Sequence, residues 1–253
     1  MSRKSTPDHR ESGKGEAGRV LRFRRKLLRW YAKSARDLPW RQTRDPYRVL
    51  VSEIMLQQTQ VNRVAEYYPR FLAEFPDLET LAAAPARAVR EAWDGLGYYA
   101  RARNLHSLAK TVVERGVPEN GAAGDRGRLP ETPAELIELP GIGRYTAGAI
   151  ASFAYEKPVP AVDTNVARVI RRVFFGERLT GERTTAKHRI PDRLIWETAT
   201  RLVPRNGKRA WKFNQAVMEL GAVVCRARGP KCAQCPVLQE CTTGRKRPPP
   251  TRT

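Results

Sequence analysis

The chain has 253 residues, 41% of them hydrophobic, which is enough to form one large domain or two small lobes. Its 47 Lys and Arg against 26 Asp and Glu give a net charge of +21, which predicts a polyanionic partner unless it reflects only an Arg-rich genome. No apolar run reaches the ~18 residues of a membrane span or resembles a secretory signal, so we expect a cytoplasmic protein without membrane contact.

Helical spacing of apolar residues runs through most of the chain. Residues 1–17 precede it and predict a disordered basic arm. Because no convincing period-two strand interrupts the helical pattern, the predicted fold class is all-α. The expected helices are marked by apolar residues within 21–31, 47–59, 64–75, 105–112, 149–153, 166–173 and 213–224.

Several residues mark where helices begin and end. Asp45 followed by Pro46 is a helix start, and Thr132 with Glu135 has the form of a capping box. Residues 115–130 are rich in Gly, Pro and charge and predict a flexible loop, while 244–253 predict a disordered basic tail.

All four cysteines lie in one short segment near the C-terminus, with the spacing C-x6-C-x2-C-x5-C. In a chain without a secretory signal this clustering predicts metal binding rather than disulfides. Zinc and an iron–sulfur cluster both remain open on spacing, and unliganded buried thiols are the third possibility. The candidate ligands are Cys225, Cys232, Cys235 and Cys241, with the cations Arg226, Arg228 and Lys231 between the first two.

Three other segments carry candidate chemistry. The turn around Gly141 and Gly143 can bring bare backbone N–H groups to a phosphate, or can be an ordinary helix–helix turn. Asp163 is either an acid of the site or the N-cap of the following helix, or both, and Glu53 lies either at the exposed edge of an apolar helix or facing a cleft.

The segment from Gly95 to Tyr99 is followed by Arg101 and Arg103. Its aromatic rings can stack on bases while the arginines bind phosphate, or the two tyrosines can belong to the core.

Together, SEIMLQQTQV, GLGYYARARNL, LPGIGRYTAGAI, VDTNVARV and the cysteine pattern resemble the helix-hairpin-helix DNA glycosylases of the endonuclease III superfamily. GLGYY and MLQQTQ are most similar to the adenine DNA glycosylases of the MutY type. The resemblance implies two helical lobes with an active-site cleft between them. One is a six-helix barrel over 46–155, and the other carries a [4Fe–4S] cluster and combines 18–45 with 156–243.

The resemblance also implies a monomeric enzyme that acts on double-stranded DNA, near the nucleoid, and flips the target base into its pocket. A protonated Glu53, with its pKa raised by burial, donates to adenine N7, and an ionised Asp163 stabilises the oxocarbenium-like sugar. Tyr145 stands where strand-cleaving relatives have a Lys, so we expect a glycosylase that leaves an abasic site. Other residues match positions with known roles in the family. By this resemblance, Asn165 supports the site, and Trp40 and Arg41 lie near the flipped base. Gln58 and Tyr98 enter the base stack, while Gly141 and Gly143 contact the DNA backbone.

Two departures from the family pattern stand out. The sequence ends soon after Cys241, so we expect no second domain of the kind that senses 8-oxoguanine in typical adenine glycosylases, and Thr164 stands where many of them have Gly. A thymine or uracil glycosylase acting opposite guanine is the main alternative. A non-catalytic cluster-bearing DNA-binding protein is the third.

Overall fold

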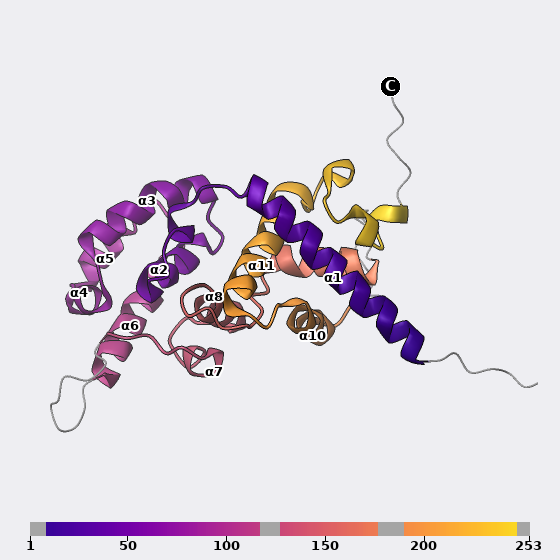
Figure 1. Ribbon diagram of the computed structural model, residues 1–253. Coiled ribbons are helices and arrows are strands. Elements are labelled where there is room, and N and C mark those ends of the chain that lie inside the picture. Colours follow the sequence, from indigo (N-terminus) through magenta and orange to yellow (C-terminus); the bar gives the residue numbers. More distant parts are fainter. Residues whose placement is uncertain (1–8, 117–126, 177–189, 247–253) are drawn as a thin grey trace, which may run out of the picture. The chain divides into compact units, whose positions relative to one another are not determined.

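The structure is a computed structural model that describes residues 9–116, 127–176 and 190–246. Within these ranges the secondary structure is helical and contains no strand, which confirms the predicted all-α class (Figure 1). Contacts divide the chain into two compact units, residues 36–161 and residues 1–35 with 162–253. None of the helices in the described ranges has the length and apolar character of a transmembrane helix.

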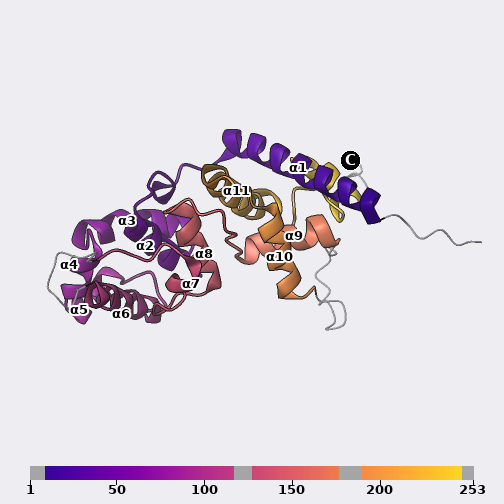
Figure 2. The ribbon, with the colours of Figure 1, turned by 60° about the horizontal axis from the view of Figure 1, so that its bottom comes forward.

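The unit formed by residues 36–161 is built from short helices (Figure 2). They are η1 (Pro39–Arg41), α2 (Pro46–Leu56), α3 (Val61–Glu74), α4 (Leu78–Ala83), α5 (Ala86–Ala92), α6 (Ala100–Arg115), α7 (Pro133–Leu136) and α8 (Arg144–Phe153).

Helix α2 is the centre of this unit and contacts α3, α6 and α8. The Asp45 side chain caps it, as predicted, by accepting from the Arg48 N–H at 2.8 Å, and Pro46 occupies the first helical position. Nearly every α2 side chain is buried, so this helix is covered on all sides. The fully buried Trp93 packs edge-on against Phe71 with ring centroids 5.7 Å apart, and burying a side chain of this kind contributes roughly 1.5–3 kcal/mol.

The second unit pairs the first helix of the chain with its last elements. Its elements are α1 (His9–Ser34), α9 (Thr164–Ile170), η2 (Arg171–Phe175), α10 (Asp192–Leu202), α11 (Gly207–Glu219), η4 (Leu220–Val224), η5 (Cys232–Gln234), η6 (Leu238–Glu240) and η7 (Gly244–Lys246). The π-helical turns η2 and η4 extend α9 and α11.

Helix α1 ties this unit together. Its buried Phe23 and Leu27 belong to the same apolar core as α9, α10 and α11. At its surface, Lys26 forms an ion pair of 3.2 Å with the buried Glu240, and the Arg19 guanidinium donates to the Glu240 carbonyl at 2.7 Å. The N-terminal helix therefore anchors the segment that carries the last cysteine.

The unit boundaries at 35/36 and 161/162 differ from the predicted 45/46 and 155/156. The reason is packing at both ends. The short helix η1 contacts α2, and the Lys157 N–H donates to the Ala151 carbonyl of α8 at 2.9 Å. A Cβ on Gly148 would lie 2.3 Å from the Pro160 carbonyl oxygen, so α8 and this segment are in close contact.

The predicted disordered ends need correction where they are described. Helix α1 begins at His9, so residues 9–17 of the expected arm are helical, and residues 244–246 of the expected tail form η7. Apolar spacing misses a helical extension that has no apolar face, although Arg, Glu and Ala are good helix formers. Residues 1–8, 247–253 and most of the predicted 115–130 loop (117–126) lie outside the described residues.

Candidate functional site

Glu53 lies in the middle of α2, and its side chain is not at an exposed edge. The residue is 5% exposed, and its Oε2 accepts a hydrogen bond of 2.6 Å from the Tyr145 hydroxyl. Tyr145 is the second residue of α8, which packs on α2. The unit thus pairs a buried carboxyl with a phenol, a setting in which the group can hold and deliver a proton.

The Asp163 side chain caps α9, which confirms the N-cap interpretation. Its two oxygens accept from the Val166 N–H at 2.7 Å and from the Asn165 side-chain amide at 2.8 Å. Burial raises the pKa of the Asp163 carboxyl, while these hydrogen bonds and the charge of Arg168 oppose the rise. The carboxyl is therefore held in one orientation by donors that favour its ionised form.

Arg168 connects this acid to the first cysteine, which the sequence analysis did not anticipate. Its guanidinium donates to the Asn165 side-chain oxygen at 2.7 Å and to the Cys225 carbonyl at 2.9 Å. Asp163, Asn165 and Arg168 thus form a continuous hydrogen-bonded chain that ends at Cys225. In the sequence, the only indication of this role is that an arginine follows Asp163 and Asn165 by about one helical turn.

Gly221 makes room for this chain, and we expect Gly221→Ala to disturb it. A Cβ there would lie 2.7 Å from the Asn165 Cβ and 3.1 Å from its carbonyl oxygen, so the start of α9 must shift. Overpacking of this kind costs about 1–3 kcal/mol. Chemical denaturation measures the loss against Gly15→Ala, a helical position with no atom within 4 Å of the added Cβ. A Gly221→Ala protein as stable as the parent would contradict this packing.

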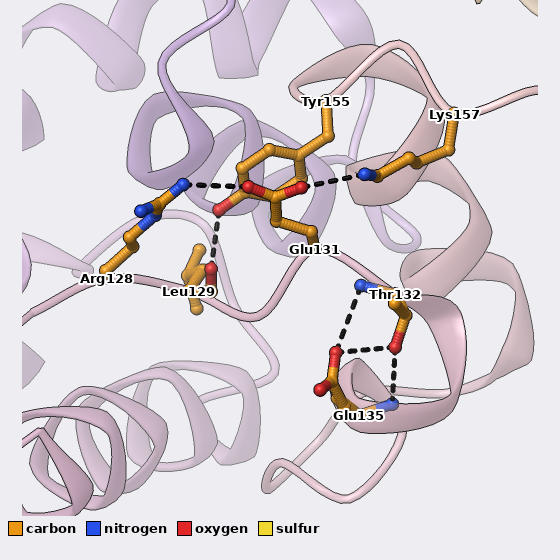
Figure 3. Close-up of polar contacts among 7 residues, drawn as sticks. All are labelled: Arg128, Leu129, Glu131, Thr132, Glu135, Tyr155 and Lys157. Carbon is orange, nitrogen blue, oxygen red and sulfur yellow. Dashed lines mark hydrogen bonds and ion pairs between the residues drawn. The ribbon is translucent and has the colours of Figure 1, made fainter. Parts of the chain in front are cut away.

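The predicted hairpin joins α7 to α8 as expected. Thr132 and Glu135 form both hydrogen bonds of the capping box that starts α7 (Figure 3). Gly141 has φ +78°, and a Cβ there would lie 2.8 Å from the Asn104 Cβ, so the turn requires glycine. At Gly143, the N-cap of α8, no atom lies within 4 Å of a Cβ position, which leaves its backbone open to an incoming group.

The approach to the hairpin is fixed by the contacts drawn in Figure 3. Glu131 forms ion pairs with Arg128 at 2.8 Å and with Lys157 at 2.7 Å. The Tyr155 hydroxyl donates to the Leu129 carbonyl at 2.6 Å. The chain that leads into α7 is therefore held against the end of α8.

Gln58 and Tyr98 share an unusual backbone conformation and are both exposed. Their φ angles are 58° and 48°, which side-chain-bearing residues rarely adopt, and Tyr98 is 63% exposed rather than part of the core. The structure contradicts the interpretation in which Arg101 binds phosphate. Arg101 is 8% exposed, and its guanidinium binds backbone carbonyls of the two loops that hold Gln58 and Tyr98.

Trp40 and Arg41 lie in η1. The Trp40 ring is buried and packs edge-on against Tyr68 at 5.7 Å, so it shapes the local core. Arg41 is half-buried, and its guanidinium donates to the Arg36 carbonyl at 3.1 Å. Their predicted place near a flipped base remains a prediction.

The four cysteines line one pocket, together with Arg172 and Gly244. All four are free thiols, and none of the described cysteines is paired in a disulfide. Two donors point at sulfur: the Gly244 N–H lies 3.1 Å from the Cys241 Sγ, and the Arg172 guanidinium lies 3.5 Å from the Cys225 Sγ. No group of three or more His, Cys, Asp or Glu side chains in the described ranges has the arrangement of a bound metal ion.

Burial disfavours the charged form of two thiols in this pocket, those of Cys235 and Cys241. Burial raises the pKa of the Cys235 thiol to about 12, against a hydrogen bond at Val237, and the other three cysteines act in the same direction as burial. Burial likewise raises the pKa of Cys241. These two thiols therefore become thiolates only when positive charge lies among them. Four cysteine sulfurs that line one pocket are a donor set that fits a thiolate-bound metal centre.

The loop between the first two cysteines has three exposed cations, of which Arg226 also donates to the Gly229 carbonyl of the same loop at 2.9 Å. Arg226, Arg228 and Lys231 are exposed. The buried Arg172 holds the loop backbone in place, because its guanidinium donates to the Arg226 carbonyl at 2.7 Å and to the Ala227 carbonyl at 3.2 Å. A fixed loop with exposed cations suits contact with phosphates.

Comparison with known proteins gives one family and several relatives. The sequence model described as HhH-GPD superfamily base excision DNA repair protein matches residues 51–190. Adenine DNA glycosylase from Rattus norvegicus is 45% identical over 231 residues, which cover 88% of this chain and 42% of that protein. Adenine DNA glycosylase from Mycobacterium tuberculosis (strain ATCC 25618 / H37Rv) is 42% identical over 212 residues, which cover 83% of this chain and 64% of that protein.

Among solved structures, a thermostable thymine-DNA glycosylase superposes with a TM-score of 0.76 at 31% identity. The match covers 92% of this chain and 99% of that one. The chain therefore spans less than half of the rat protein but nearly the whole of the thymine-DNA glycosylase.

Proposed function

Because the chain belongs to the HhH-GPD superfamily of base excision DNA repair proteins, we propose that it is a DNA glycosylase that removes adenine mispaired with 8-oxoguanine or guanine. The observation that carries the proposal is the buried Glu53 carboxyl, which is hydrogen-bonded to the Tyr145 hydroxyl. Adenine specificity is supported by the similarity to the adenine DNA glycosylases over most of this chain.

Two carboxyls have separate roles in the proposed reaction. Glu53 delivers a proton to N7 of the flipped adenine, which makes the base a better leaving group. Asp163, oriented by the Val166 and Asn165 donors, stabilises the positive charge that develops on the sugar. The bond between the sugar and N9 of adenine breaks and adenine leaves. Water then adds to the sugar and loses a proton, so that an abasic site remains in the DNA.

Tyr145 makes the proposed enzyme monofunctional. A strand-cleaving lyase needs an amine that forms a Schiff base with the sugar, and a phenol cannot form one. The Tyr145 hydroxyl is instead engaged with Glu53.

We propose that the four cysteines hold a [4Fe–4S] cluster, because their pocket brings four free thiols and two hydrogen-bond donors together. When bound, the cluster cross-links the segment from 225 to 241 and supplies no acid or base to the reaction. The exposed Arg226, Arg228 and Lys231 then contact the phosphate backbone of double-stranded DNA, and the turn around Gly141 and Gly143 contacts it as well.

A second candidate is removal of thymine or uracil opposite guanine. The likeness to the thymine-DNA glycosylase structure over nearly its whole length favours it. A cleavage panel separates the two candidates.

In this panel, duplexes with A opposite 8-oxoguanine, A opposite G, T opposite G and U opposite G are incubated with the protein, with and without alkali afterwards. An A·T duplex is the control. We expect product from the first two duplexes only, and only after alkali, because Tyr145 stands where strand-cleaving relatives have a lysine and its phenol cannot form a Schiff base. Product from the T·G and U·G duplexes alone would replace the adenine assignment, and strand breaks without alkali would contradict the assignment as monofunctional.

A further inference from the structure

Gln58 and Tyr98, called the wedge residues below, carry backbone strain before any DNA is bound. Both have φ in the left-handed region, at 58° and 48°. Residues with side chains occupy this region only when surrounding structure holds them there, and such strain gathers at functional positions. Both residues are exposed, so burial of their side chains does not supply the constraint.

One buried guanidinium, that of Arg101, reaches the backbone beside both wedge residues. Its Nη1 donates to two carbonyls in the last turn of α2 and to the carbonyl of the residue before Gln58. Its Nη2 donates to the carbonyls of the two residues before Tyr98. The accepting carbonyls are those of Ile54 (3.1 Å), Met55 (2.8 Å), Gln57 (2.5 Å), Leu96 (3.0 Å) and Gly97 (3.0 Å).

Two aromatic rings enclose the same group. The Arg101 guanidinium carbon lies 5.5 Å from the Trp93 ring centroid and 5.6 Å from that of Tyr98. The Trp93 indole N–H also donates to the Gly97 carbonyl at 3.2 Å. One wedge side chain, Tyr98, therefore packs directly on Arg101, while the other, Gln58, follows a residue whose carbonyl Arg101 binds.

We propose that Arg101 is a positioning residue that fixes the two wedge residues relative to each other before the protein meets DNA. The planar guanidinium is suited to this because its donors point in fixed directions from two nitrogens, whereas an ammonium is a single point of attachment. The inference rests on the proposed function and on the role that the sequence resemblance implies for the wedge residues, which is to enter the base stack. Preorganisation of this kind lowers the cost of reaching the productive complex.

The test uses Arg101→Lys, which keeps the charge but cannot bridge both sets of carbonyls. The matched control is Arg115→Lys at the exposed far end of α6. Amide hydrogen exchange of the DNA-free protein is followed at residues 57–59 and 96–99. We expect faster exchange in both segments for Arg101→Lys only, with exchange elsewhere and the melting temperature matching the control.

Function is measured separately. Single-turnover excision is expected to fall by about tenfold to a hundredfold, as for other misplaced groups, while affinity for an undamaged duplex changes less than about threefold. Insertion of the wedge residues is also followed without chemistry, by the fluorescence of 2-aminopurine placed beside the mismatch, and we expect a smaller increase than for the parent protein.

The outcomes are distinguishable. Unchanged local exchange and unchanged 2-aminopurine fluorescence would overturn the positioning role. A variant that fails to fold, or that exchanges faster throughout, would also overturn it, because Arg101 would then belong to the fold in general. If the parent protein excises no adenine, the proposed function fails, while exchange and fluorescence still decide whether Arg101 positions the wedge residues.

Discussion

Replacing Glu53 with glutamine is expected to lower the rate of adenine excision by about 10²–10⁴-fold, the usual contribution of a general acid. Glutamine has nearly the same shape and can still accept the hydrogen bond that the Tyr145 hydroxyl makes to Glu53 at 2.6 Å. What it cannot do is give up an acidic proton. The substitution therefore removes the chemistry while leaving the packing of α2 on α8 in place.

Single-turnover excision of A opposite 8-oxoguanine measures the loss, and gel-shift titration of the same duplex measures binding. Glu66→Gln is the matched control, because Glu66 is exposed and its ion pair with Arg70 is of the surface kind that contributes little. We expect both variants to bind DNA and melt like the parent protein. Excision by Glu53→Gln at the parental rate would remove Glu53 from the reaction and favour a non-catalytic DNA-binding protein.

Local sequence signals predicted the parts of the fold that depend on neighbouring residues. Asp45 and Pro46 start α2, and Thr132 with Glu135 forms the capping box of α7, because a cap is decided within four residues. The expected run to Thr59, in contrast, ends at Leu56. The difference arises because the following residues turn into the left-handed region at Gln58, where distant groups hold the backbone.

Arginines were the residues that sequence reasoning placed least well. Arg101 stands in a motif beside two tyrosines, for which a phosphate contact was one of two interpretations, but its guanidinium is buried among carbonyls of α2 and of the loops that hold Gln58 and Tyr98. No sequence pattern singled out Arg168 or Arg172, although Arg168 binds the Cys225 carbonyl and Arg172 binds the Arg226 carbonyl. A positive charge count cannot separate cations that face solvent from those that satisfy backbone acceptors, because that distinction is made only by tertiary packing.

The cysteine pocket has the second large expected effect. Cys235→Ser is expected to abolish incorporation of the proposed iron–sulfur cluster, because a serine hydroxyl is a much weaker ligand than a thiolate. Of the remaining thiols, Cys241 then stays in a setting where burial raises its pKa and disfavours the thiolate. Iron analysis and visible absorbance report the cluster, and thermal melting reports the fold, for which we expect a clear loss of stability.

The same variant tests whether the pocket orders the basic loop. The logarithm of DNA affinity falls with the logarithm of salt concentration, with a slope of about −0.9 for each phosphate contact. Loss of the phosphate contacts of the three loop cations should therefore make this slope less steep by up to about 3. The control is Arg228→Gln, an exposed position in the loop, which should make the slope less steep by about 1 and leave iron content and melting unchanged.

If Cys235→Ser lacks iron yet binds DNA with the parental slope, the loop is ordered without the cluster. The contacts from Arg172 to the Arg226 and Ala227 carbonyls would then be sufficient on their own. If instead the slope becomes less steep as expected, the cluster and Arg172 act together. Hydrogen bonds connect Cys225 through Arg168 and Asn165 to Asp163, so a displacement of the cysteine segment would also displace the Asp163 carboxyl. Cys235→Ser should therefore also slow excision at saturating protein.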